Sequence, residues 1–177
     1  HMTKTRPYII CHMMASLDGR IDCTMTSKLS GVDTYYHALS ALNLPTTVSG
    51  KTTAEMEITN ARFSGDAGVP VEKETFYCAE EASGYSIITD TRGTLGWRGS
   101  SVDGKPLLIL LSEQVGEKYL AYLMENGISY IVCGKKRIDL PRAAELLRTE
   151  FHVERIGIVG GGTINAAFLD AGLLDKI

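Results

Sequence analysis

Three consecutive glycines, Gly160, Gly161 and Gly162, follow an apolar strand-like run and lead directly into a segment that begins Thr163-Ile164 and has a helical pattern. Glycine allows the main chain to come close to an anion. The first turn of a helix adds unpaired N–H groups and the positive end of the helix dipole. The arrangement predicts a phosphate cradle for a nucleotide pyrophosphate, although the glycines alone fit a plain strand-to-helix turn equally well.

A second glycine turn, at Gly50, opens a predicted helix whose first residues are Lys51, Thr52 and Thr53. An ammonium group and two hydroxyls in a first helical turn suit a second anion cradle. A threonine at this position is also a common helix cap, which needs no ligand. Gly50 and Thr53 are therefore candidates for nucleotide binding.

Polar residues follow two further predicted strands: Asp90, Thr91 and Arg92 after one, and Ser112 after the next. An acid at a strand end can bind a ribose hydroxyl, as in NAD sites, whereas a hydroxyl and a guanidinium can bind a 2′-phosphate, as in NADP sites. The residues by themselves leave this choice open. The basic run at 135–137 adds positive charge at the same edge, and its simplest interpretation is a solvated loop.

The first predicted strand leads into Ala15, Ser16 and Asp18. The two small residues would let a flat ring lie against the main chain, and Asp18 places a carboxylate near the mouth of the sheet. Asp18 also precedes a glycine, which is typical of a turn-capping side chain. The histidines lie far apart, so the spacing predicts neither a metal site nor a nucleophilic triad.

The 177-residue chain has the length and composition of one globular domain, with 44% hydrophobic and 22% charged residues. A net charge of −3 disfavours a nucleic-acid binder, and no apolar run is long enough to span a bilayer. The cysteines include no C-x-x-C pair, which favours reduced thiols in a cytoplasm. We interpret His1-Met2 as a cloning remnant and expect a single domain over residues 1–177.

Apolar runs alternate with helical patterns, which predicts an α/β fold with a mainly parallel sheet. Ligands of such sheets bind beyond the carboxyl ends of the strands. A long segment, 59–85, lacks periodicity and is expected to be a lid or a disordered loop. The predicted strands are 8–15, 46–49, 86–90, 107–111, 129–133 and 155–159. The predicted helices are 33–42, 114–126 and one that is capped by Asp139 and has Pro141 in its first turn.

Four segments, 14–20, 48–53, 90–93 and 160–175, resemble in order the reductase domain of bacterial riboflavin biosynthesis. This is the C-terminal domain of a bifunctional deaminase-reductase, in the dihydrofolate reductase-like superfamily. The resemblance implies a three-layer α/β/α fold with a mainly parallel central sheet. It also implies NADPH-dependent reduction of a phosphoribosylamino-uracil, in which hydride from the nicotinamide opens the phosphoribosyl unit to a ribityl chain.

The resemblance favours NADPH over NADH and places Thr91 and Arg92 at its 2′-phosphate. It places Ser16 and Asp18 at the substrate, where Asp18 would be the catalytic residue that orients it. The expected cofactor-binding residues are Ala15, Gly50, Thr53, Thr91, Arg92, Ser112, Gly160, Gly161, Gly162, Thr163 and Ile164.

Two departures concern the substrate. Val159 stands where family reductases usually carry a glutamate, and Glu57-Ile58-Thr59 replaces an Asp-Asp-Pro. Glu57 is nevertheless a candidate substrate contact. The alternatives are an NADPH-dependent reductase of another small heterocycle, such as a pterin, and a nucleotide-binding relative without catalysis. The family continues beyond Ile177 into further strands, so we expect an open sheet edge and a homodimer.

Overall fold

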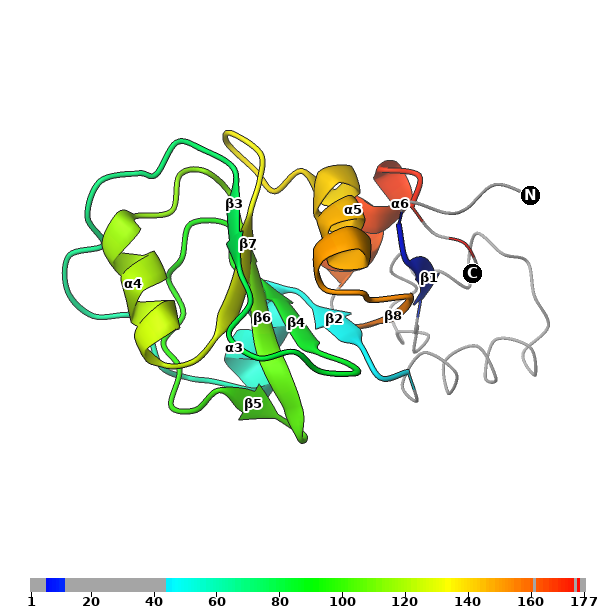
Figure 1. The fold of residues 1–177 in the computed structure, drawn as a ribbon, viewed down its shortest axis with the longest axis horizontal. Coiled ribbons are helices and arrows are strands. Elements are labelled where there is room, and N and C mark those ends of the chain that lie inside the picture. Colours follow the sequence, from blue (N-terminus) through cyan, green and yellow to red (C-terminus); the bar gives the residue numbers. More distant parts are fainter. Residues whose placement is uncertain (1–5, 12–43, 161, 174, 176–177) are drawn as a thin grey trace.

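The computed structural model describes residues 6–11, 44–160, 162–173 and 175. These residues form an eight-stranded sheet with the path β1-β8-β2-β4-β6-β7-β3, and β5 pairs with β6 off this path (Figure 1). Pairing is parallel from β1 through β7 and antiparallel at β3 and β5. The strands are β1 (Tyr8–Cys11), β2 (Thr47–Ser49), β3 (Thr75–Tyr77), β4 (Ser86–Thr89), β5 (Ser101–Val102), β6 (Lys105–Leu111), β7 (Ser129–Val132) and β8 (Arg155–Gly160).

Helices cover both faces of the sheet, which confirms the predicted three-layer α/β/α fold. On one face, α5 (Leu140–Glu150) and α6 (Gly162–Asp170) bury their apolar sides against β4, β6, β7 and β8. On the other, α3 (Lys51–Glu57) and α4 (Glu117–Glu125) pack against the alternate residues of β4, β6 and β7. The strands are apolar on both faces because both faces are covered.

All six predicted strands are present, and where they are described their ends differ from the prediction by no more than two residues. The helix expected at 114–126 begins later, at Glu117, because the preceding residues form a turn: Gln114 N–H donates to Ser112 Oγ at 3.3 Å. Asp139 caps α5 as predicted by accepting a hydrogen bond from Arg142 N–H. Residues 12–15 and the helix expected at 33–42 lie outside the described residues.

The prediction of a lid or disordered loop at 59–85 is wrong. Its residues Thr75–Tyr77 form β3, the antiparallel edge strand next to β7. Glu74, beside this strand, accepts hydrogen bonds from the Arg142 guanidinium of α5. Isolated bridges also join Arg62 to Leu95 and Pro70 to Gly116. A strand of three residues is too short to show a period, and its partners are distant in sequence, so local pattern could not reveal it.

Asp175 contacts the main chain of β1. Asp175 N–H donates to Ile9 O at 3.0 Å, and its carboxylate accepts from Ile9 N–H at 2.9 Å. Arg6 also pairs with both oxygens of this carboxylate, at 2.7 and 3.0 Å. These contacts join the beginning of β1 to the segment that follows α6.

The carboxylate of Asp90 organises the turn after β4. Asp90 is fully buried, and its Oδ2 accepts hydrogen bonds from the N–H groups of Thr94 and Leu95, each at 2.9 Å. Thr94 Oγ1 donates to Oδ1 at 3.1 Å, and the Tyr119 hydroxyl of α4 lies 3.2 Å from Oδ2. Burial, together with the nearby Asp90 carboxylate, raises the pKa of Tyr119. The turn is therefore attached to the core through one side chain.

We predict that Asp90→Ala lowers the free energy of unfolding by about 2 to 6 kcal/mol, because it leaves two buried backbone donors without an acceptor. Asp90→Asn retains an acceptor and should cost less than about 2 kcal/mol, and Thr94→Val should cost about 1 kcal/mol. Urea unfolding followed by circular dichroism measures all three. A loss in Asp90→Asn as large as in Asp90→Ala would show that charge, rather than hydrogen bonding, holds the turn.

Candidate functional site

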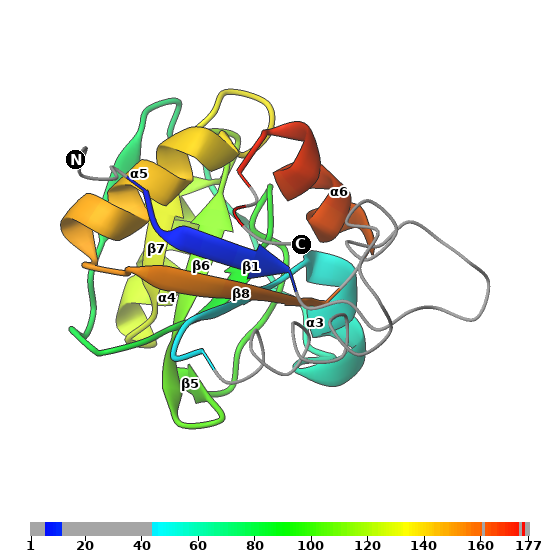
Figure 2. The same cartoon turned by 90° about the vertical axis from the view of Figure 1, so that its right-hand side faces the viewer.

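A cavity of about 530 Å³ lies at the carboxyl edge of the sheet, within the usual range for small-molecule sites. Figure 2 shows β1 and β8 running toward this edge, with α3 and α6 at their carboxyl ends. Four segments contribute: the start of α3, the end of β4, the loop between β7 and α5, and the first turns of α6. The lining residues are Gly50, Lys51, Thr52, Thr53, Met56, Thr89, Thr91, Arg137, Ile138, Leu140, Thr163, Ile164 and Ala167.

The two predicted glycine turns meet at this cavity. A Cβ at Gly160 would lie 2.7 Å from Thr53 Cγ2, so glycine is required for the end of β8 to approach the first turn of α3. A Cβ at Gly50 would contact Ile164 of α6 at 3.4 Å. Segments more than 100 residues apart in sequence are thus in direct contact, whereas Gly161 lies outside the described residues.

The chemistry of the lining suits an anion attached to an apolar group. Lys51 and Arg137 provide positive charge, and no aspartate or glutamate is among the described residues that line the cavity. The hydroxyls of Thr53, Thr89 and Thr91 also line it. The apolar remainder consists of Met56, Ile138, Leu140, Ile164 and Ala167. A nucleotide carries both kinds of group, a phosphate and a flat ring.

The structure bears on the choice between NAD and NADP that the sequence leaves open at the end of β4. A carboxylate that forms hydrogen bonds with the ribose hydroxyls of NAD would have to face the cavity. The Asp90 carboxylate faces the interior instead, where it accepts hydrogen bonds from Thr94 and Leu95. Thr91, the next residue, lines the cavity. At the end of β4 the Asp90 carboxylate is therefore engaged by its own turn, and Thr91 is the residue that lines the cavity.

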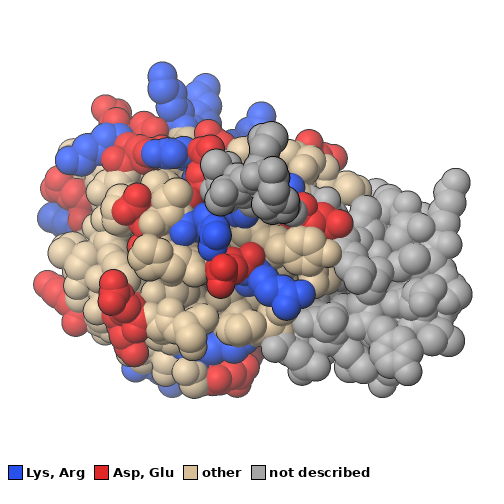
Figure 3. Space-filling model, turned by 45° about the vertical axis from the view of Figure 1, so that its right-hand side comes forward, with Lys and Arg blue, Asp and Glu red and all other residues tan. Residues whose placement is uncertain are grey.

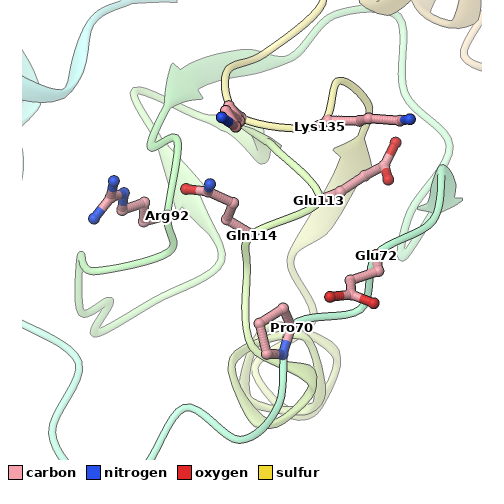
Figure 4. A pocket seen from close by; sticks show the side chains of 7 residues that line it. Pro70, Glu72, Arg92, Glu113, Gln114 and Lys135 are labelled. Carbon is pink, nitrogen blue, oxygen red and sulfur yellow. The ribbon is translucent and has the colours of Figure 1, made fainter.

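Arg92 lines a different, adjacent cavity of about 730 Å³ (Figure 4). In this view Arg92 lies on one side of Gln114, and Lys135, Glu113 and Glu72 lie on the other side. After β4, Thr91 lines the first cavity and Arg92 lines the second. In the loop after β7, Arg137 lines the first cavity and Lys136 lines the second. These two pairs form the boundary between the cavities, and the structure separates Thr91 from Arg92.

Four other predicted site residues that the structure describes are not among those that line the first cavity: Gly160, Gly162, Ser112 and Glu57. Ser112 is fully buried, and its hydroxyl donates to Thr91 O at 2.8 Å, so it connects the ends of β4 and β6. Glu57 is the exposed last residue of α3 and lines neither of the two cavities. Ala15, Ser16 and Asp18 lie outside the described residues.

Several lining residues were not predicted. Arg137 belongs to a basic run that the sequence suggests is solvated. Ile138 comes from the loop that leads into α5, and Leu140 is the first residue of that helix. Met56 is 79% exposed although it lies on the cavity side of α3. A signal in the sequence existed only for Arg137, which belongs to the basic run that follows the predicted strand at 129–133. The apolar residues resemble ordinary core positions in the sequence.

Other kinds of site receive no support from the part of the chain that the structure describes. It contains no group of three His, Cys, Asp or Glu side chains suited to a metal ion. None of its helices combines the length and apolar character that a bilayer crossing requires.

Comparison with known proteins identifies solved structures with a similar fold and a family whose model matches the chain. RibD of Acinetobacter baumannii aligns with a TM-score of 0.57 and 18% identity over 97% of this chain and 44% of its own. Rib7, the riboflavin biosynthesis reductase of Saccharomyces cerevisiae, aligns with a TM-score of 0.57 and 18% identity over 99% of this chain and 72% of its own. The chain thus spans less than half the length of the Acinetobacter protein.

No curated protein sequence matches the chain significantly. The model of the RibD C-terminal domain matches residues 7–177. Because this match extends over nearly the whole chain, the protein belongs to the RibD C-terminal domain family.

Proposed function

We propose that the protein is an NADPH-dependent reductase of the riboflavin pathway that acts on a phosphoribosylamino-uracil. Family membership and the likeness to RibD and to the reductase Rib7 support this activity. The observation that carries the proposal is the cavity at the carboxyl edge, which is lined by Gly50 and by Thr163, the residue directly after the three glycines. Its described lining contains cations and hydroxyls but no acid. NADPH, when bound, would supply the hydride that converts the ribosyl unit to a ribityl chain.

The residues of the chain would bind and orient this cofactor. Thr163 and the N–H groups at the beginning of α6 would hold the pyrophosphate, together with Thr53 from the opposite side of the cavity. Ile138 and Leu140 offer the apolar surface against which an adenine ring can pack. Gly50 and Gly160 let the two walls come close enough to contact the ligand from both sides.

The charge on the surface is consistent with a small-molecule partner. On the face shown in Figure 3, Lys and Arg side chains are interspersed with Asp and Glu and form no continuous basic stripe. A nucleic-acid-binding surface would usually show such a stripe.

Val159 favours a second candidate activity, which is the reduction of another heterocycle such as a pterin. This half-buried valine immediately precedes the glycines, where a family reductase usually has a carboxylate. A polar substrate group without its partner would lose about 1 to 3 kcal/mol. Turnover measured with the pyrimidine and with pterins separates the two activities. Nucleotide binding without any turnover would indicate a non-catalytic relative.

The cofactor assignment is tested by fluorescence titration with NADPH and NADH. We expect saturable binding of NADPH that is tighter than that of NADH. If neither dinucleotide binds, the proposed function is wrong.

A variant at the contact between the two turns tests where the cofactor binds. Gly160→Ala should weaken NADPH binding by about tenfold, because its Cβ displaces Thr53 from the cavity wall. Thr53→Ser removes the methyl group that the new Cβ would meet and keeps the hydroxyl. The double variant should therefore regain most of the affinity. Unchanged NADPH affinity in Gly160→Ala would contradict the placement of the cofactor between the two turns.

Asp18, which lies outside the described residues, remains our proposed catalytic residue. Hydride transfer depends on the alignment of the reacting carbons, so a carboxylate there would orient the substrate and stabilise developing positive charge. Asp18→Asn should keep NADPH affinity and lose about tenfold to a hundredfold in kcat/KM. Steady-state kinetics and the same titration measure both. Normal turnover would reduce Asp18 to a turn cap.

A further inference from the structure

We propose that Arg137, together with Thr91, distinguishes NADPH from NADH by binding the 2′-phosphate of the adenosine ribose. The proposal rests on the proposed function and assigns the selectivity of that site to the loop between β7 and α5. It takes the place of the assignment to Arg92 that the sequence favours.

The position of Arg137 in the cavity fits this phosphate. The beginning of α6, which follows β8, marks the pyrophosphate end, and Thr91 marks the end beyond β4. The sheet order β8-β2-β4 places these strands two spacings apart, about 10 Å. One ribose with its 2′-phosphate covers a comparable distance. Arg137 lines the same cavity as Thr91, so a hydroxyl and a guanidinium are available for one phosphate.

Arg137 is held by a fixed stretch of main chain. Gly134 has a φ of +92°, and its α-carbon packs against the Arg137 carbonyl so closely that a side chain would collide with it. Glu113 N–H donates to Gly134 O at 2.7 Å, and Asp139 N–H donates to Cys133 O at 3.1 Å. The loop is therefore attached at both ends, so little main-chain order has to be gained when the ligand binds.

The Arg137 side chain is also available. It is exposed, and it forms no ion pair or hydrogen bond with any other described residue. Arg142, five residues later, differs, because Glu74 and Glu145 hold its guanidinium. Among the described residues that line the cavity there is no acid that would compete with a phosphate for Arg137.

Arg92 provides a matched control from the same edge of the sheet. It is an exposed arginine that follows a parallel strand, as Arg137 does, but it lines the neighbouring cavity together with Glu72 and Glu113. Lys51 provides a second control. It lies in the first turn of α3, beside Gly50 and Thr53, and lines the cavity where we propose that either dinucleotide would place its pyrophosphate.

The test measures binding by calorimetry, without turnover, for NADPH and NADH and for the fragments 2′,5′-ADP and 5′-AMP. Arg137→Ala should weaken NADPH and 2′,5′-ADP by about tenfold and change NADH and 5′-AMP by less than about twofold. Arg92→Ala should keep the wild-type ratio of NADPH to NADH affinity. Lys51→Ala should weaken both dinucleotides to a similar extent. Thermal unfolding checks that each variant remains folded.

Two results would overturn the proposal. Equal losses of NADPH and NADH in Arg137→Ala would mean that the residue acts only on the shape of the loop. A selective loss of NADPH in Arg92→Ala, with Arg137→Ala unaffected, would place the 2′-phosphate in the neighbouring cavity. If the wild-type protein binds neither dinucleotide, the proposed function itself fails, and this outcome is distinct from both.

Discussion

The buried carboxylate of Asp90 is the interaction on which the carboxyl edge of the sheet depends. A carboxylate without exposure to solvent must find donors within the protein, and Asp90 finds them in the turn that follows it and near α4. This requirement turns the acid inward and leaves Thr91 and Arg92 as the groups that the strand end presents. The same network thus holds the turn and keeps the Asp90 carboxylate directed into the protein.

Parallel pairing provides the second constraint. Because β8, β2, β4, β6 and β7 run in one direction, the residues after each strand meet at a single edge. Main-chain hydrogen bonds then connect these loops to one another, from Thr91 to Ser112 and from Glu113 to Gly134. The lining of the cavity is therefore supported by main-chain contacts rather than by mobile side chains. A site built in this way needs little rearrangement to receive a ligand.

Neighbouring residues of one loop serve different cavities. Thr91 and Arg137 line the smaller cavity, whereas Arg92 and Lys136 line the larger one. Thr91-Arg92 lie in a turn and Lys136-Arg137 in a bend, and in each pair the two residues line different cavities. Charge at a strand end therefore does not specify which cavity it serves. For this reason our proposal assigns the 2′-phosphate to Arg137, which lies in the basic run at 135–137. It does not assign it to Arg92, which the sequence favours.

The sequence by itself determined the α/β class, the six parallel strands, the cap at Asp139 and the two glycine turns, because each depends on local periodicity or on the conformational freedom of a few adjacent residues. The family followed from four motifs in order, and the match to the RibD C-terminal domain confirms it. Only the tertiary structure decided the strand at Thr75–Tyr77, the inward direction of Asp90 and the separation of Thr91 from Arg92. The strand at Thr75–Tyr77 pairs with β7, and the Asp90 carboxylate is approached by Tyr119 of α4 as well as by its own turn. Contacts between segments so far apart leave no periodic trace in the chain.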